Sequence, residues 1–138
     1  MPRLYLLDTN VIIAALKGQH EVRRRLEAEA KEALRLSAIV LGELYFGVEK
    51  SAYGERNRTR LAALTERLPL VGIDHETIRH YGRIRATLEG QGAPIGANDT
   101  WIAAQALAIG ATLVTDNLRE FSRVPDLPVE TWLQARQA

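Results

Sequence analysis

The stretch LYLLDTNVIIAAL, which runs from Leu4 to Leu16, places three polar residues between two apolar runs. The first run, Leu4–Leu7, is apolar at every position, which is typical of a strand covered on both faces of a parallel sheet. The second run, Val11–Leu16, predicts a short helix. Asp8, Thr9 and Asn10 lie between the two runs, at positions where apolar side chains would pack better. We therefore interpret these three polar residues as functional. The stretch therefore predicts a strand and a helix with polar side chains at their junction.

Short apolar runs alternate with longer segments of helical period along the rest of the chain, which is typical of β–α units on a parallel sheet. No linker, low-complexity tract or repeat divides residues 1–138, so the sequence predicts a single α/β domain. Further strands are predicted at Leu34–Leu36, Leu70–Ile73, Thr112–Thr115 and from Val129. Further helices are predicted over Glu21–Ala33, over Ala38–Lys50 with Ser37 as N-cap, over Glu55–Arg67, from an Asp74 cap to about Glu89, and from Ala97 or Asn98 to Gly110.

The composition restricts the chemistry that the chain can carry out. Its 138 residues include no cysteine, which excludes disulfides, thiolate zinc sites, iron–sulfur clusters and thiol nucleophiles. The 18 Lys and Arg residues nearly balance the 17 Asp and Glu residues, so any basic patch that attracts nucleic acid must be local. No run approaches the ~18 apolar residues of a membrane span, and no signal-peptide cleavage site follows the first apolar run. We therefore expect a cytoplasmic protein without a membrane partner.

Four acidic residues stand at positions that favour a shared site. Asp8 and Asp116 each directly follow a predicted strand, and the carboxyl ends of parallel strands meet at one edge of a sheet. Asp99 lies in the first turn of a predicted helix, and Glu43 interrupts an apolar helical segment where an unpaired acid is costly to bury. Taken alone, Asp99 is also explained as a helix N-terminal acid, Asp116 as a turn residue and Glu43 as a helix-edge residue that reaches solvent. Together, the four predict an acidic site assembled from several loops.

A cluster of carboxylates requires a cation, because unpaired carboxylates repel one another. Oxygen ligands without cysteine or a suitably spaced histidine pair favour a hard ion, Mg²⁺ or Mn²⁺, held by carboxylates, water and substrate phosphate. Such an ion polarises a phosphoryl oxygen and supplies hydroxide from bound water. The acidic site therefore predicts metal-dependent chemistry on phosphate esters.

Four segments carry a recognisable pattern: LLDTNVII from Leu6, LGELYFG from Leu41, IGANDTWIAA from Ile95 and LVTDNLREF from Leu113. In this order and spacing they resemble the PIN-domain nucleases and, more narrowly, the VapC toxins of bacterial toxin–antitoxin pairs. The resemblance extends over nearly the whole chain. It implies a PIN-like three-layer α/β sandwich, with a parallel sheet of about five strands flanked by helices. It also implies a Mg²⁺-dependent endoribonuclease.

The resemblance assigns roles by position. The implied catalytic acids are Asp8, Glu43, Asp99 and Asp116. The implied metal ligands are Asp8, Asp99 and Asp116, while Glu43 acts directly or through water. The implied supporting residues, two hydroxyls that orient the carboxylates and one further polar side chain, are Thr9, Thr115 and Asn10. The reaction that follows is in-line attack of metal-bound water on an RNA phosphodiester, which leaves a 5′-phosphate and a 3′-hydroxyl.

The expected partners are RNA and other proteins. Arg79, Arg83 and Arg119 are candidates for binding RNA phosphate. Trp101 could stack on a base, although packing in the core or at a dimer interface is the favoured interpretation. The resemblance also implies a cognate VapB-like antitoxin, whose C-terminal tail lies in a groove near the active site. It further implies a homodimer, or a larger toxin–antitoxin assembly.

Other functional classes fit less well. A phosphoacceptor receiver domain needs a lysine near its final strand, but Lys17, Lys31 and Lys50 all come early in this chain. A phosphatase of the dehalogenase class requires an acid two residues after Asp8, where Asn10 stands. Within the PIN fold, an RNA-processing nuclease that is not a toxin and a non-catalytic binding scaffold remain as alternatives.

Overall fold

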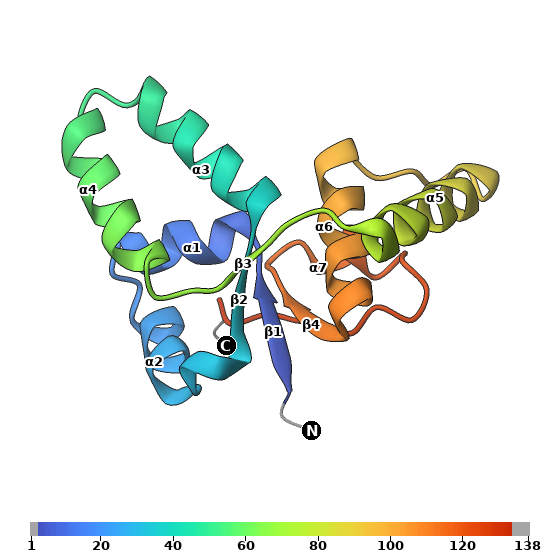
Figure 1. Ribbon diagram of the computed structural model, residues 1–138, viewed down its shortest axis with the longest axis horizontal. Coiled ribbons are helices and arrows are strands. Elements are labelled where there is room, and N and C mark those ends of the chain that lie inside the picture. Colours follow the sequence, from blue (N-terminus) through green and yellow to red (C-terminus); the bar gives the residue numbers. More distant parts are fainter. Residues whose placement is uncertain (1–2, 134–138) are drawn as a thin grey trace.

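A computed structural model describes residues 3–133 as a five-stranded sheet flanked by helices (Figure 1). The strand order is β3-β2-β1-β4-β5, and every pairing is parallel. The predicted α/β architecture with a parallel sheet is therefore confirmed. The strands are β1 (Leu4–Leu7), β2 (Leu34–Ser37), β3 (Leu70–Val71), β4 (Ala111–Val114) and β5 (Val129–Glu130).

The central strand is β1, which pairs with β2 on one side and with β4 on the other. Leu6 and Leu7 of β1 are 0% exposed, as are Leu113 and Val114 of β4. Because helices cover both faces of these strands, a polar side chain would be buried on either face. This burial explains why the first strand of the chain is an unbroken apolar run.

Helices cover both faces of the sheet, and Figure 1 shows α1 to α4 on one side of the strands and α5 to α7 on the other. Ser37 Oγ accepts hydrogen bonds from the backbone N–H groups of Ile39 and Val40, which makes Ser37 the N-cap of α3 as predicted. Among the helices of residues 3–133, none has both the length and the apolar character to cross a bilayer. The helices are α1 (Thr9–Leu16), α2 (His20–Ala28), α3 (Ala38–Lys50), α4 (Gly54–Thr65), α5 (His75–Gly90), α6 (Ala97–Ile109) and α7 (Leu118–Phe121).

The prediction of a helix over Glu21–Ala33 is wrong for the residues after Ala28. α2 ends at Ala28, because Glu29 has an extended backbone with φ −88° and ψ 147°. A 3-10 turn, η1 (Lys31–Ala33), then leads into β2. The early end allows Ala33, which is 7% exposed, to join the core where β2 begins beside β1. Strand pairing thus overrides the helical period of this segment.

The predicted strand Leu70–Ile73 is longer than β3, which ends at Val71. The backbone carbonyls of Val71 and Gly72 each accept a 3.0 Å hydrogen bond from Gln105 Nε2 of α6. The Gln105 side chain therefore donates to these carbonyls, which would otherwise accept hydrogen bonds from a neighbouring strand. The short helix α7 has no counterpart among the predicted helices, because its four residues are too few to show a helical period.

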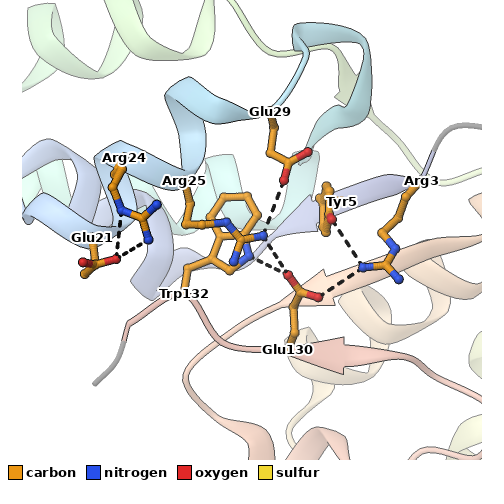
Figure 2. Close-up of polar contacts among 8 residues, drawn as sticks. All are labelled: Arg3, Tyr5, Glu21, Arg24, Arg25, Glu29, Glu130 and Trp132. Carbon is orange, nitrogen blue, oxygen red and sulfur yellow. Dashed lines mark hydrogen bonds and ion pairs between the residues drawn. The ribbon is translucent and has the colours of Figure 1, made fainter. Parts of the chain in front are cut away.

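The last strand is joined to α2 by a cluster of charged and aromatic side chains, which we call the C-terminal clasp (Figure 2). The Arg25 guanidinium lies 4.5 Å from the ring centroid of Trp132, and Arg25 Nη2 is 3.3 Å from Glu130 Oε2. Trp132 Nε1 donates a 2.7 Å hydrogen bond to the same Glu130 oxygen. The Glu130 backbone carbonyl in turn accepts a hydrogen bond from the Thr115 N–H at 3.0 Å. The members of the clasp are Arg3, Tyr5, Arg25, Glu29, Glu130 and Trp132.

Candidate active site

The candidate site begins where β1 and β4 end. Leu7 and Val114 are paired in register, so the residues that follow them, Asp8 and Thr115, lie side by side. Thr115 Oγ donates a 2.7 Å hydrogen bond to Asp8 Oδ2, and the Thr9 N–H donates a 2.8 Å bond to Asp8 Oδ1. Asp8 is only 6% exposed and also caps α1. Both of its carboxylate oxygens are therefore held in a single orientation.

Glu43 reaches the same edge of the sheet from α3. Its Oε1 accepts a 2.5 Å hydrogen bond from the Thr9 hydroxyl, and its Oε2 accepts a 2.8 Å bond from Asn98 Nδ2. Three helices, α1, α3 and α6, therefore meet at this carboxylate. The two hydrogen bonds offset the cost of placing a half-buried acid in an apolar helix.

Asp116 lies in the loop after β4, where it is exposed. Asn10 Nδ2, in the first turn of α1, donates a 3.0 Å hydrogen bond to Asp116 Oδ1. The bond joins two segments that are 106 residues apart in the sequence. Asn10 therefore orients Asp116, just as Thr115 orients Asp8.

Asp99 lies in the first turn of α6 and is partly buried. Its burial, the negative charge of Asp8 and a hydrogen bond with Glu120 together raise the pKa of Asp99 to about 7. The charges of Glu120 and Glu43 act in the same direction. Asp99 therefore lies near three other carboxylates, those of Asp8, Glu43 and Glu120. A role as a helix N-terminal acid alone does not explain this clustering.

The pKa of Asp8 is also raised, and burial is the largest cause. The charges of Glu43 and Asp116 add to the increase, whereas the hydrogen bonds from Thr115 and Thr9 favour the ionised form. Asp8 and Asp99 therefore lie close enough to other predicted acids for those negative charges to oppose their ionisation. The structure brings Asp8, Glu43, Asp99 and Asp116 to one edge of the sheet.

Glu120 is a fifth acid of the site that the sequence analysis does not select. It lies on α7, and its charge and hydrogen bond raise the pKa of Asp99. Asn117 Nδ2 donates a 3.1 Å hydrogen bond to Glu120 Oε1. The available signal is its place in the sequence, because Glu120 follows Asp116 by four residues in the segment after β4.

The donor set of the site fits a hard cation. Carboxylate, hydroxyl and amide groups gather there. The pKa values of Asp8 and Asp99 are raised first by burial and then by the charges of neighbouring acids, and a bound cation would favour the ionised form of both. Within residues 3–133, no three His, Asp or Glu side chains are close enough to hold an ion by themselves. This arrangement is compatible with Mg²⁺, which is usually bound by one or two carboxylates together with waters and substrate phosphate.

Of the residues expected to bind RNA, Arg79 and Arg83 lie on α5, and Arg119 lies on α7 next to Glu120. Arg79 of α5 forms an exposed ion pair with Glu76, with Nη1 and Oε2 3.1 Å apart. Arg83 of α5 and Arg119 of α7 are exposed. Trp101 stacks on Tyr81, with ring centroids 3.8 Å apart and planes 18° apart. One face of the Trp101 ring therefore packs against α5, in agreement with the interpretation as a packing residue.

A groove between α1, α3 and α4 opens beside the acids. Its cavity of about 290 Å³ is mostly apolar, with Ile13, Leu44 and Leu61 in its lining, and it includes Glu43. A second cavity of about 500 Å³ between α1, α2 and α4 shares Leu16 and Arg60 with the first. The first cavity thus connects Glu43 to the last turn of α1, and the second continues from there with a more charged lining.

Comparison with known proteins supports the motif-based resemblance. The family model of the PIN domain matches residues 5–127. The chain is 40% identical to Ribonuclease VapC2 of Rickettsia felis over 94% of its own length and 98% of that protein. It is 38% identical to the tRNA(fMet)-specific endonuclease VapC of Salmonella typhimurium over 93% of its own length and 97% of that protein.

Solved structures show the same fold. VapBC2 from Rickettsia felis, bound to a DNA fragment from its promoter, matches with a TM-score of 0.88 and 38% identity, over 94% of this chain and 98% of that one. DNA-bound VapBC from Salmonella typhimurium matches with a TM-score of 0.89 and 36% identity, over 95% and 99% of the two chains. The predicted PIN-like sandwich is confirmed. The chain belongs to the PIN-domain family and, within it, to the VapC ribonucleases.

Proposed function

We propose that the chain is a Mg²⁺-dependent endoribonuclease that acts in the cytoplasm as the toxin of a toxin–antitoxin pair. The observation that carries this proposal is the position of Asp8, whose two oxygens are fixed by Thr115 and Thr9 beside an Asp99 with its pKa raised to about 7. A preorganised Asp8 carboxylate, whose charge opposes the ionisation of Asp99, supports a site for a divalent cation. Family membership supports phosphodiester hydrolysis as the reaction at that site.

In the proposed mechanism, the acids of the site have different roles. Bound Mg²⁺, or Mn²⁺ in its place, would polarise a phosphoryl oxygen and provide a water nucleophile at neutral pH. Asp8 and Asp99 would be the principal ligands of the cation, with Asp116 close by. Glu43 would reach the cation through the attacking water and would accept a proton of that water at its carboxylate. In-line displacement would break the bond from phosphorus to the 3′ oxygen, which would take a proton from solvent, leaving a 5′-phosphate on one RNA fragment and a 3′-hydroxyl on the other.

RNA is the proposed substrate, and tRNA(fMet) is the first RNA to test. Relatives are named ribonucleases, and the Salmonella typhimurium relative is named for tRNA(fMet). Arg83 and Arg119 are exposed and form no ion pair with another residue of the range 3–133, so they can meet backbone phosphate as the RNA approaches, whereas Arg79 would first have to leave Glu76. Charge reversal of Arg83 should therefore weaken RNA binding and reduce its dependence on salt.

A VapB-like antitoxin is the proposed inhibitor, and a homodimer is the proposed assembly of the toxin. The matching solved structures are VapBC complexes. The apolar groove between α1, α3 and α4 provides a surface for an extended segment whose end would reach Glu43. An antitoxin segment bound in this groove would block access to the acids, and it would leave uncovered the face of α5 that carries Arg83.

The test is RNA cleavage with purified protein in Mg²⁺ and in EDTA. Wild type is expected to cut in Mg²⁺ only, and Asp8→Asn and Asp99→Asn to lose at least about 100-fold in rate, since each removes a carboxylate that no other residue replaces. Asp126→Asn is the matched control. Asp126 is exposed with φ 67°, a conformation that asparagine tolerates. Full activity in Asp8→Asn and Asp99→Asn would refute the proposed site, and activity in EDTA would refute metal dependence.

A further inference from the structure

Two polar contacts join α3 to α6, one at each end of the face that they share. At the buried end, Ser37 Oγ donates a 2.5 Å hydrogen bond to Gln105 Oε1. At the end near the acids, Asn98 Nδ2 donates a 2.8 Å bond to Glu43 Oε2. Asn98 and Gln105 are about two helical turns apart, so they lie on the same face of α6. The position of α6 along α3 is therefore defined at two separate points.

The buried contact makes this position rigid. Gln105 is 0% exposed, and its Nε2 also donates to the carbonyls of Val71 and Gly72. Ser37, also 0% exposed, caps α3 by accepting hydrogen bonds from the backbone N–H groups of Ile39 and Val40. A buried polar group with all its partners is costly to displace, because movement would leave donors or acceptors unpaired. α6 consequently cannot slide along α3 without breaking this cluster.

The contact near the acids has a different chemistry. A carboxylate offers about four lone-pair positions. Thr9 and Asn98 use one position on each Glu43 oxygen, which leaves a position on each for water or a phosphate-bound cation. Asn98 provides its hydrogen bond without adding negative charge to a site that already holds Asp8 and Asp99.

We propose that Asn98 is a positioning residue, whose amide holds the Glu43 carboxylate at the orientation in which it acts on the attacking water. The inference rests on the proposed function of the site. Asn98 is exposed in the first turn of α6, where alanine is also well accommodated in a helix. Its replacement should therefore remove the hydrogen bond without disturbing the fold.

The experiment compares wild type with Asn98→Ala and Asn98→Gln, the second of which keeps an amide donor on a longer side chain. Arg58→Ala is the matched control, because Arg58 Nη2 donates a hydrogen bond of the same 2.8 Å length to Glu49, which lies on the same helix α3 but outside the site. The measurements are kcat and KM for RNA cleavage, Mn²⁺ affinity by calorimetry, and the melting temperature. Groups that hold the ligands of a metal site typically contribute about 10- to 100-fold to metal affinity or activity.

Asn98→Ala is expected to lower kcat about 10-fold with KM within about two-fold, and to weaken Mn²⁺ binding, with the melting temperature unchanged. Asn98→Gln is expected to recover most of the loss, and Arg58→Ala to show none. The inference is overturned if kcat and Mn²⁺ affinity of Asn98→Ala both match wild type, or if Arg58→Ala loses as much. Failure of wild type to cleave RNA would instead refute the proposed function, and the Mn²⁺ comparison would still test Asn98.

Discussion

The Thr115 hydroxyl donates a 2.7 Å hydrogen bond to Asp8 Oδ2, which joins the ends of the neighbouring strands β4 and β1. Both residues are buried, with Thr115 0% and Asp8 6% exposed. The hydrogen bond favours the ionised carboxylate, whereas burial opposes it and raises the pKa of Asp8. A single hydroxyl thus offsets part of the cost of keeping a charged ligand in the core.

Thr115→Val removes this hydroxyl while keeping the shape of the side chain. The pKa of Asp8 should rise further, and the protein should lose about 1–3 kcal/mol of unfolding free energy, because a buried carboxylate oxygen loses its partner. Cleavage at neutral pH should fall about 10-fold. Urea unfolding and steady-state kinetics measure the two effects. Thr112→Val, within β4 and away from the site, is the control and should retain activity.

The raised pKa of Asp99 predicts how stability depends on pH in the metal-free protein. The pKa in the folded protein, about 7, exceeds the ordinary value of 3.8, so the folded state binds more protons than the unfolded state between these values. The contribution of Asp99 to stability is therefore full below about pH 4, falls as pH rises, and is lost above about pH 7. Asp8 acts in the same direction, since its pKa is also raised.

Melting temperatures in EDTA across pH 4 to pH 8 check this prediction. The wild type should lose stability over the range relative to Asp99→Asn, which cannot titrate at this position. Mg²⁺ should stabilise the wild type more at pH 8 than at pH 5, because protons compete with the cation at low pH. Parallel melting curves for wild type and Asp99→Asn would contradict the assigned pKa.

Glu120→Gln is expected to lower the pKa of Asp99, because both the charge of Glu120 and its hydrogen bond raise it. The metal-free variant should consequently be more stable than wild type near pH 7, whereas cleavage should fall about 10-fold as the cation loses an acidic neighbour. Carboxyl NMR titration follows the pKa directly. Glu89→Gln, which alters an exposed ion pair with Arg85 on α5, should leave the pKa of Asp99 unchanged.

The C-terminal clasp predicts a difference between two neighbouring arginines in Figure 2. Arg25→Lys should cost about 1–2 kcal/mol of unfolding free energy, because lysine cannot stack on Trp132 and bridge two carboxylates at once. Arg24→Lys should cost less than about 0.5 kcal/mol, since the pair with Glu21 is exposed on both sides. Chemical denaturation of both variants provides the comparison, and equal losses would show that stacking on Trp132 contributes nothing.

Much of the fold follows from local patterns in the sequence. The apolar run Leu4–Leu7 specifies a strand buried on both faces, and Ser37 caps α3 where the sequence predicts a cap. Apart from the short helix α7, which the sequence does not predict, the errors lie at the ends of elements. α2 stops at Ala28 and β3 stops at Val71 because of partners that are distant in the sequence, and a helical or strand period cannot report those partners.

The sequence by itself determined the order of the five strands and of helices α1 to α6 along the chain, and which acids follow the strands. Burial on both faces of a parallel sheet leaves a continuous apolar run and a polar residue at its end. Only the tertiary structure decided that Glu43 is held by Thr9 and Asn98, and that Glu120 lies beside Asp99. These relationships depend on how α3, α6 and α7 pack around the sheet edge. Glu43 and Asn98 are 55 residues apart, and the contact between them arises from helix packing, which no local periodicity encodes.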